Sequence, residues 1–194
     1  MRDDALRDAA PAPAAAVRPC ESRAGRAGAE GQTIVSAIVR DQAGVLVRVA
    51  ELFSRRGYNI EGLTVGPIPR SGLSRMTIAL RCAEADVEQV QRQLEKLVDV
   101  LAVRRMPPSS GVLRELALVK VEADASRRAE VIHIAEVFRS RVVDVSTETL
   151  TVEVTGDGDK VDGLVELLAP YGIREMARTG VSALERGPAY LGLD

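Results

Sequence analysis

Between residues 33 and 106, apolar side chains recur with spacings that change along the chain, and each spacing predicts one element. Residues 33–40 form a largely apolar run that is typical of a well-buried strand. After Gly44, helical spacing continues until Gly57, with apolar side chains at Val45, Leu46, Val49, Leu52 and Phe53. Strands follow over 59–66 and 73–81, the second with alternating apolar side chains. A helix and a strand over 99–105 complete the order βαββαβ; the helix face carries Val87, Val90, Leu94 and Leu97.

A second series of elements follows the run MPPSSG at residues 106–111, whose prolines and glycine indicate a linker. Strands are expected over 115–122 and 141–146. The helix between them, over 126–139, is expected to face the core with Ile132, Ala135 and Phe138. The order then repeats with an alternating strand (Leu150, Val152, Val154), a helix (Val161, Leu164, Val165, Leu168) and a strand over 172–178. The pattern predicts an α+β fold of two ferredoxin-like domains in tandem, over residues 32–106 and 112–187.

Residues 1–31 differ from the rest of the chain. They are rich in Ala, Pro, Gly and Arg and hold few large apolar side chains, so we expect a disordered extension. A transit peptide is the alternative, but the acidic residues Asp3, Asp4 and Asp8 argue against it.

The sheet of a ferredoxin-like domain has helices on one face, which leaves the other face uncovered. In the first domain we expect that face to carry Val35, Ala37 and Val39, or their neighbours. Such a face is too apolar to be left in water. Pairing of two copies is the simplest cover, so a homodimer is predicted.

The composition excludes several classes of function but does not identify one. The 194 residues hold 26 Lys+Arg and 28 Asp+Glu, so the formal charge of −2 provides no field that would recruit nucleic acid or an anionic membrane. No apolar run is long enough to span a bilayer. The two cysteines, Cys20 and Cys82, cannot build a disulfide framework or a four-ligand zinc site. We therefore expect a cytoplasmic protein with no metal, nucleic-acid or membrane partner.

The run DQAGVL at residues 41–46 is the strongest candidate site. Gly44 has an ordinary explanation, because a glycine often supplies an unusual backbone angle between a strand and a helix. The functional interpretation is that free amides of residues 44–46 (Gly44, Val45, Leu46) lie at a helix N-terminus, where a carboxylate is favoured. Asp41 would then pair with an ammonium group, and Leu46 or Ile60 would receive an aliphatic side chain. Together these describe a site for an α-amino acid.

Other polar residues carry weaker signals. Asn59 is either an ordinary turn residue or a ligand contact that reaches across a dimer interface. His133 lies between Glu130 and Glu136 on a charged helix face, where a solvated side chain is the simpler expectation. The run Gly156–Asp159 lacks phosphate-binding spacing, so a turn and a helix cap explain it.

Two other functions fit this topology less well. An RNA-binding sheet needs surface aromatic residues, and the predicted strands over 33–40 and 73–81 contain none. A small enzyme of the acylphosphatase type needs an arginine within a phosphate-cradling loop. Arg40 precedes the loop, but it lies on the predicted strand, and Gln42 and Ala43 offer no matching cradle.

The chain also resembles a known family. The run RDQAGVLVRVAELFSRRGYNIEGLTVGP, followed by LSRMTI and KLVDVL, is similar to the regulatory (small) subunit of acetohydroxyacid synthase, also called acetolactate synthase. The likeness continues through LALVKV, IAEVFRSRVVDVS and ARTGVSALERG, so it covers residues 33–187. The glycine loop occurs in every ACT domain, whereas RGYNI combined with LSRMTI and KLVDVL is much more specific.

The resemblance implies a non-catalytic subunit that activates a catalytic large subunit and confers feedback inhibition by valine or another branched-chain amino acid. Thiamine diphosphate, FAD and magnesium would be bound by the large subunit, with no cofactor in this chain. By position, the ligand contacts fall on Asp41, Gly44, Val45, Leu46, and on Asn59 and Ile60 of the neighbouring protomer. Family members often have Asn at the position of Asp41. The second domain has no equivalent glycine loop, so it should not bind the effector in the same way.

The alternative is a free-standing ACT-domain sensor that regulates a different enzyme, which would leave residues 112–187 unexplained. If the regulatory-subunit interpretation holds, a fragment ending near Pro107 contains the whole predicted site. Such a fragment is expected to dimerise and to bind valine.

Overall fold

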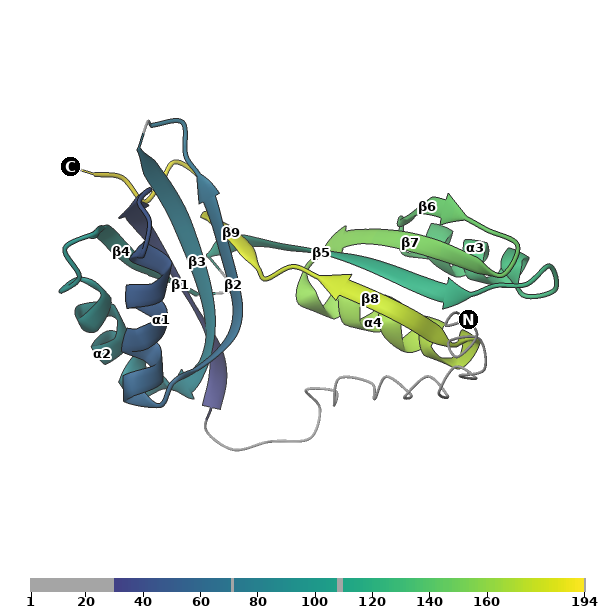
Figure 1. The fold of residues 1–194 in the computed structure, drawn as a ribbon, viewed down its shortest axis with the longest axis horizontal. Helices are drawn as coiled ribbons and strands as arrows, with labels where there is room; N and C mark the ends of the chain where they lie inside the picture. The colour runs from purple at the N-terminus through teal and green to yellow at the C-terminus, as the bar shows by residue number, and fades with distance from the viewer. Residues whose placement is uncertain (1–29, 71, 108–109, 194) are drawn as a thin grey trace, which may run out of the picture.

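The computed structural model describes residues 30–70, 72–107 and 110–193. The first half of this region folds as one antiparallel sheet with two helices on one face (Figure 1). The strand order is β2-β3-β1-β4. The elements are β1 (Glu30–Arg40), α1 (Val45–Arg56), β2 (Asn59–Pro67), β3 (Leu73–Ala83), α2 (Glu84–Leu94) and β4 (Val100–Met106).

The second half repeats this arrangement with strand order β6-β7-β5-β8, again with both helices on one face. Its elements are β5 (Gly111–Glu122), α3 (Arg128–Val137), β6 (Arg141–Val145), β7 (Thr149–Gly156), α4 (Gly158–Leu168), the short 3-10 helix η2 (Ala169–Tyr171), β8 (Ile173–Arg178) and β9 (Ser182–Glu185). The predicted α+β fold of two tandem ferredoxin-like domains is therefore confirmed. The predicted extension lies outside the described residues, except for Glu30 and Gly31, which begin β1.

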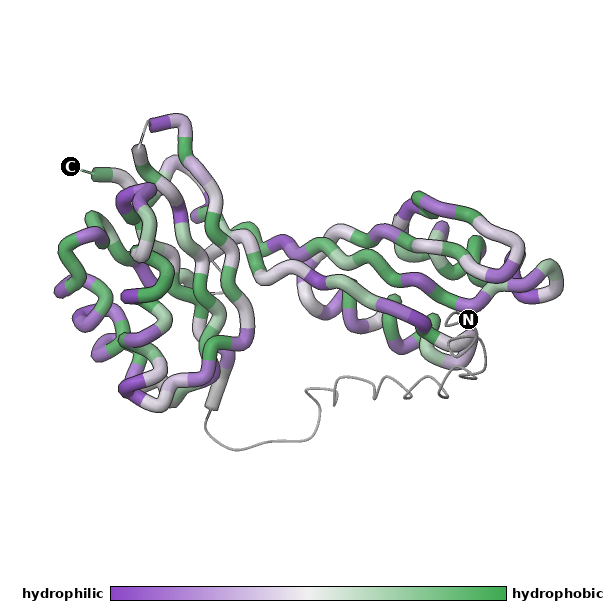
Figure 2. The backbone as a smooth tube through the Cα atoms, viewed as in Figure 1, coloured by the Kyte–Doolittle hydropathy of each residue, from purple (hydrophilic) through white to green (hydrophobic). Residues whose placement is uncertain are grey.

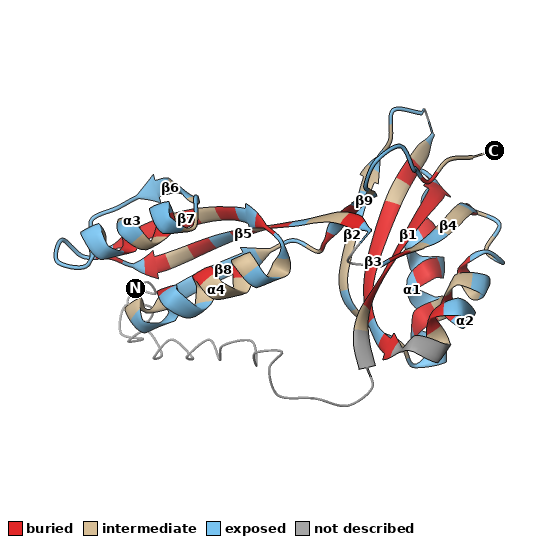
Figure 3. Cartoon of the chain, turned by 180° about the vertical axis from the view of Figure 1, so that it is seen from behind, coloured by how far each residue is buried: buried red, intermediate tan, exposed pale blue. Residues whose placement is uncertain are grey.

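Each sheet and its helices enclose a separate core. Hydrophobic residues lie along the strands of both domains (Figure 2), and the strands of both sheets carry buried residues (Figure 3). In the first domain the core joins β1 and β3 to α1 and α2. Its largest fully buried members include Phe53, Ile78, Leu80 and Leu94. In the second domain Val131 and Ala135 are the buried residues of α3, whereas Ile132 and Phe138 are only partly buried.

The structure places different residues of β1 on the sheet face that lacks helices than the sequence predicted. Val35, Ala37 and Val39 point into the core under the helices. Their neighbours Ile34 and Ile38 are on the other side of the strand, as alternation requires, and each is only 1% exposed. This chain supplies cover for that other face, because Ile34 and Met106 pack with Val181 and Ala183 in a third apolar cluster.

The covering segment was not predicted from the sequence. The first four residues of β5, Gly111–Arg114, pair with the short strand β9. The later part of β5 pairs with β7 and β8 in the second sheet. We call Gly111–Arg114 together with Gly180–Glu185 the ribbon. It joins the two domains and lies against the first sheet on the face opposite its helices (Figure 1).

Candidate ligand-binding site

The loop between β1 and α1 has the backbone conformation that its glycine predicted. Gly44 is the N-cap residue of α1 and has φ of 85°, in the left-handed region that favours glycine. No side chain caps the helix. A Cβ atom at residue 44 would stand 3.2 Å from Nη1 of Arg48. Any larger residue here therefore meets both backbone strain and a guanidinium group.

The loop leaves several backbone amides without an acceptor. The Val45 amide donates to the Gln42 carbonyl at the long distance of 3.4 Å. Within the described residues, the amides of Ala43, Gly44, Leu46 and Val47 make no hydrogen bond. Unpaired amides at a helix N-terminus attract an anion, through hydrogen bonds and through the helix dipole. The loop is therefore suited to hold a carboxylate.

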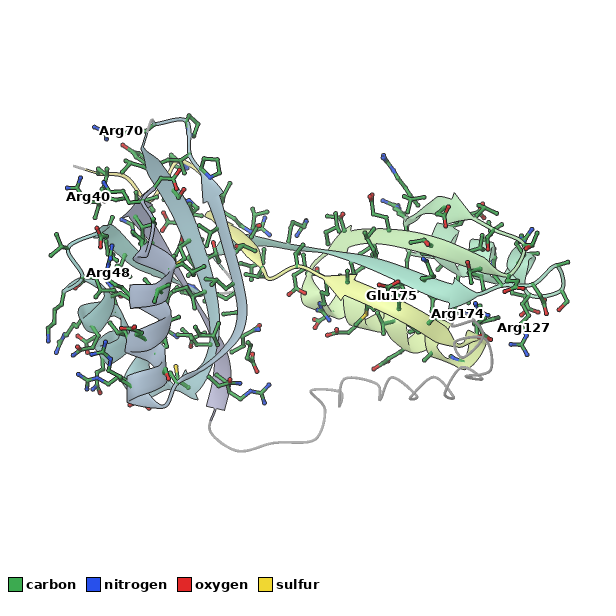
Figure 4. All side chains as sticks on the ribbon, viewed as in Figure 1. Arg40, Arg48, Arg70, Arg127, Arg174 and Glu175 are labelled. Carbon is green, nitrogen blue, oxygen red and sulfur yellow. The ribbon has the colours of Figure 1, made fainter. Side chains whose placement is uncertain are left out.

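Contacts to neighbouring turns hold the loop in place. Arg48 binds Asp99 through Nε at 2.8 Å and through Nη2 at 2.6 Å. The Asp99 carbonyl accepts the Arg40 amide at 2.8 Å, and the Asp41 amide donates to the Gly72 carbonyl at 2.8 Å. The side chains of Arg40, Arg48 and Arg70 lie at this end of the first domain (Figure 4). The sequence interpretation missed Arg48, although its position one helical turn after Gly44 was a usable signal.

The predicted ligand residues on the loop differ in how far their side chains are exposed. Val45 is 4% exposed and belongs to the core, so only its backbone faces the site. Leu46 is 47% exposed and free to meet a ligand. Asp41 is exposed, and its carboxylate makes no hydrogen bond or ion pair with the rest of the described chain.

Asn59 and Ile60 lie far from the loop in the same chain. Gly44 precedes α1 and Asn59 follows it, and a helix of 12 residues is about 18 Å long at about 1.5 Å per residue. Asn59 is exposed at the first position of β2, and Ile60 packs partly against the first core. One chain therefore does not bring the two halves of the predicted site together.

The sheet register shows how two copies would do so. Along β3, Leu73 pairs with Arg40 of β1, and Ser74 pairs with Pro67 of β2. Strands β1 and β2 therefore run in the same direction, and the end of β2 lies at the same end of the sheet as the glycine loop. Within the described residues β2 pairs only with β3, so its outer edge is open to another strand.

In the corresponding loop of the second domain, an aspartate side chain accepts the backbone amides. Asp124, two residues after β5, accepts the amides of Ser126 and Arg127 at 2.9 and 3.0 Å, and the Ser126 hydroxyl at 2.6 Å. The hydrogen bond from the Ser126 hydroxyl, with those from the two amides, holds the pKa of the Asp124 carboxyl below its usual range. An internal carboxylate thus satisfies amides in the turn that leads into α3, whereas no side chain does so in the loop before α1.

The structure gives no functional role to the other polar residues considered, His133 and the turn at Gly156–Asp159. His133 is exposed on α3. Asp157 caps α4 by accepting the Lys160 amide at 3.0 Å, as expected for this turn. The described residues contain no group of three or more His, Cys, Asp and Glu side chains that could hold a metal ion. In the same part of the chain, no helix has the length and hydrophobicity needed to cross a membrane.

Two βαββαβ units, with a glycine loop that opens the first helix, define the class of tandem ACT-domain proteins. The family model described as "AHAS small subunit-like ACT domain" matches residues 35–102, and "Small subunit of acetolactate synthase" matches residues 114–187. The second match accounts for the part of the chain that a free-standing sensor would leave unexplained.

Relatives and a solved structure agree with these matches. The chain is 52% identical to the probable acetolactate synthase small subunit of Methanothermobacter thermautotrophicus, over 79% of this chain and 92% of that protein. It is 47% identical to the acetolactate synthase small subunit of Mycolicibacterium smegmatis, over 81% of this chain and 93% of that protein. The crystal structure of the Thermotoga maritima acetolactate synthase small subunit superposes with a TM-score of 0.77 at 38% identity, covering 82% of this chain and 99% of that one. The chain belongs to the acetolactate synthase small-subunit family.

Proposed function

We propose that this chain is a non-catalytic regulatory subunit. In this proposal it raises the activity of an acetolactate synthase large subunit and lets valine, or another branched-chain amino acid, inhibit the assembled enzyme. Thiamine diphosphate, FAD and magnesium would be held by the large subunit alone. Membership of the small-subunit family supports the partner, and the geometry of the glycine loop supports the effector site.

The main support for the effector site is a difference between the two domains in how their loop amides are bonded. In the second domain, Asp124 accepts the amides of Ser126 and Arg127, in the turn that leads into α3. In the first domain the amides of Gly44, Leu46 and Val47 have no acceptor in the described chain. The loop of the first domain therefore keeps its amides available to an external carboxylate.

An α-amino acid fits the groups around these amides. Its carboxylate would accept the amides at Gly44 and Leu46, and its ammonium group would face the carboxylate of Asp41. An aliphatic side chain would contact the half-exposed Leu46. An α-amino acid with an aliphatic side chain, such as a branched-chain amino acid, has parts that match all three groups.

The second half of the site would come from another copy of the chain. If two β2 strands pair antiparallel about Leu63, Asn59 of one copy lies opposite Pro67 of the other, because these residues are the two ends of the strand. Pro67 is at the same end of the sheet as Arg40 and the glycine loop. Asn59 and Ile60 of the second copy would then approach the ligand held by the first.

A shared site can be tested by mixing two defective variants. Gly44→Asp removes the loop half and Asn59→Ala removes the second half, so each homodimer should bind L-valine poorly. A heterodimer would carry one intact site and one doubly altered site. Calorimetry on the re-equilibrated mixture should recover binding with a stoichiometry well below one L-valine per chain. No recovery despite heterodimer formation would show that the loop and Asn59 do not form one shared site.

A further inference from the structure

The ribbon meets the first domain on the strand that carries one half of the proposed effector site. The Thr64 hydroxyl of β2 donates to the Val181 carbonyl at 2.8 Å. Gly62 faces the same segment, since a Cβ atom there would stand 3.4 Å from the Cα of Gly180. Strand β2 therefore has an open edge toward a second copy and a face covered by the C-terminal segment of its own chain.

The fit at Gly180 leaves no room for a side chain. A Cβ atom at residue 180 would stand 2.7 Å from the backbone nitrogen of Leu63 and 3.0 Å from its carbonyl carbon and oxygen. These are backbone atoms, so they cannot swing aside as the end of a flexible side chain would. Two backbones in such close contact must move together, or the contact must open.

Further contacts fix the rest of the ribbon. Arg75 of β3 reaches the Ala183 carbonyl and the Ser36 hydroxyl, each at 3.4 Å, and burial lowers the pKa of Arg75, partly offset by the charge of Glu185. Arg104 of β4 pairs with Glu185 at 2.9 Å. The ribbon is thus attached to β2, β3 and β4.

The other end of the ribbon is held by the second domain. Arg178, two residues before Gly180, binds Glu115 of β5 at 2.7 Å through Nε and Asp162 of α4 at 2.5 Å through Nη1. Burial by itself would lower the pKa of Arg178, but its hydrogen bonds to Asp162 and Glu115 outweigh this effect and the pKa is raised. A displacement of Gly180 therefore reaches β5, β8 and α4 through contacts that are only partly exposed.

We propose that the contact of Gly180 and Val181 with Gly62–Thr64 of β2 couples the amino-acid site to the C-terminal domain. The inference rests on the proposed function, because it takes β2 as the strand whose edge senses the effector. A shift of β2 on amino-acid binding moves the ribbon, and the ribbon alters the second domain. Binding of the amino acid and its effect on the enzyme are then separable by changes at this contact.

The direct test is Gly180→Ala in the full-length chain, with Gly163→Ala as the matched control. Gly163 is in α4, outside the contact between the ribbon and β2, and a Cβ atom there would meet only the side chain of Phe138, at 3.3 Å. Both variants add one methyl group, so their effects on the unfolded chain are alike. Each would be combined with the large subunit for inhibition by L-valine and studied alone by calorimetry.

We expect Gly180→Ala to bind L-valine with an affinity within about threefold of the parent chain. The L-valine concentration for half-inhibition should rise at least about tenfold, within the usual range of coupling between sites. Gly163→Ala should leave both quantities unchanged. Inhibition by Gly180→Ala equal to that of the parent would overturn the coupling role and leave the effector site standing. Absence of L-valine binding to the parent chain would instead overturn the proposed function itself.

A second measurement needs no variant, so it applies even if Gly180→Ala fails to fold. Hydrogen exchange of the full-length parent chain would be followed with and without saturating L-valine. Amides of Gly180–Glu185 and Gly111–Arg114 should change their exchange rate by at least about twofold, together with those of β2. Changes limited to the loop and β2, with the ribbon unaffected, would contradict the proposal.

Discussion

Thr64 and Val181 are 117 residues apart in sequence, and a hydrogen bond of 2.8 Å joins the hydroxyl of the first to the carbonyl of the second. This bond belongs to the contact through which the C-terminal segment covers the first sheet. Homodimerisation was predicted as the cover for that face, but the chain itself supplies cover through Val181 and Ala183. Within the described residues, the outer edge of β2 stays unpaired, so a second copy would have this surface available.

Substitution of Gly44 should abolish the response to L-valine without unfolding the chain. Gly44→Asp places a carboxylate among the amides that would bind the ligand, at φ of 85° and close to Arg48. The strain of a left-handed residue should cost about 1–2 kcal/mol of folding stability. We expect an enzyme that is activated but no longer inhibited by L-valine.

Gly57→Asp is the matched control for that variant. Gly57 ends the same helix with φ of 72°, and a Cβ atom there meets nothing within 4 Å. Its melting temperature should fall by an amount similar to that of Gly44→Asp, while L-valine inhibition stays intact. Equal loss of inhibition in the two variants would show that helix strain, rather than the ligand site, is responsible.

The Asp124 turn of the second domain should make stability depend on pH. The folded pKa of Asp124 is lowered by its hydrogen bonds from Ser126 and Arg127, so the carboxylate stabilises the fold above the ordinary aspartate pKa. That contribution is lost as the pH falls through the folded pKa. Asp124→Asn keeps an acceptor but cannot titrate. We expect the parent to melt at a higher temperature than Asp124→Asn at pH 7 and the gap to close toward pH 3.

Asp124→Ala completes this comparison because it removes both the charge and the acceptor. Its melting temperature should lie below that of Asp124→Asn at both pH values. A gap between the parent and Asp124→Asn that stays constant from pH 7 to pH 3 would contradict the role assigned to the ionised Asp124.

Loss of Arg178 should weaken the junction between the ribbon and the second domain. Glu115, its partner, has a side chain that is only 9% exposed. Arg178→Ala leaves that carboxylate with poor solvation and no counter-charge, which should cost about 1–3 kcal/mol in chemical denaturation. Arg92→Ala removes an exposed pair with Glu88 and should cost less than about 1 kcal/mol. Similar losses in the two variants would mean that the Glu115 pair is no more important than a surface pair.

The ribbon changes the expectation for a fragment that ends near Pro107. The fragment keeps Asp41, Gly44 and Asn59, but it loses the segment that packs on Ile34 and Met106. We now expect it to expose this apolar face, to bind a hydrophobic dye and to aggregate more readily than the full-length chain. A monodisperse dimer with no dye binding would show that pairing of two copies covers the face instead.

The order of elements could be predicted from the sequence because each element has a local period. Positions such as Leu150, Val152 and Val154 alternate within one strand, and no distant contact is needed to interpret them. Strand β9 has four residues, and its burial depends on a sheet formed by the other domain. A local pattern this short does not distinguish such a strand from a loop, so β9 and the start of β5 were missed.

In the candidate site, likewise, the local backbone conformation could be predicted from the sequence and the tertiary contacts could not. The left-handed angle of Gly44 follows from residue type, because glycine adopts it without strain. The contact between Arg48 and Asp99 joins residues 51 positions apart, and no spacing along the chain reveals it. The burial of Val45 also depends on tertiary packing, which decides that this residue offers its backbone rather than its side chain.

The central claim is that this chain controls a partner enzyme and has no synthase activity of its own. The most direct measurement is acetolactate formation from pyruvate by the purified large subunit as this chain is titrated in, with and without L-valine. We expect no product from this chain alone, a rate that rises to a plateau near equimolar subunits, and a lower plateau in L-valine. A large-subunit rate unchanged at every ratio would contradict a regulatory role for this chain.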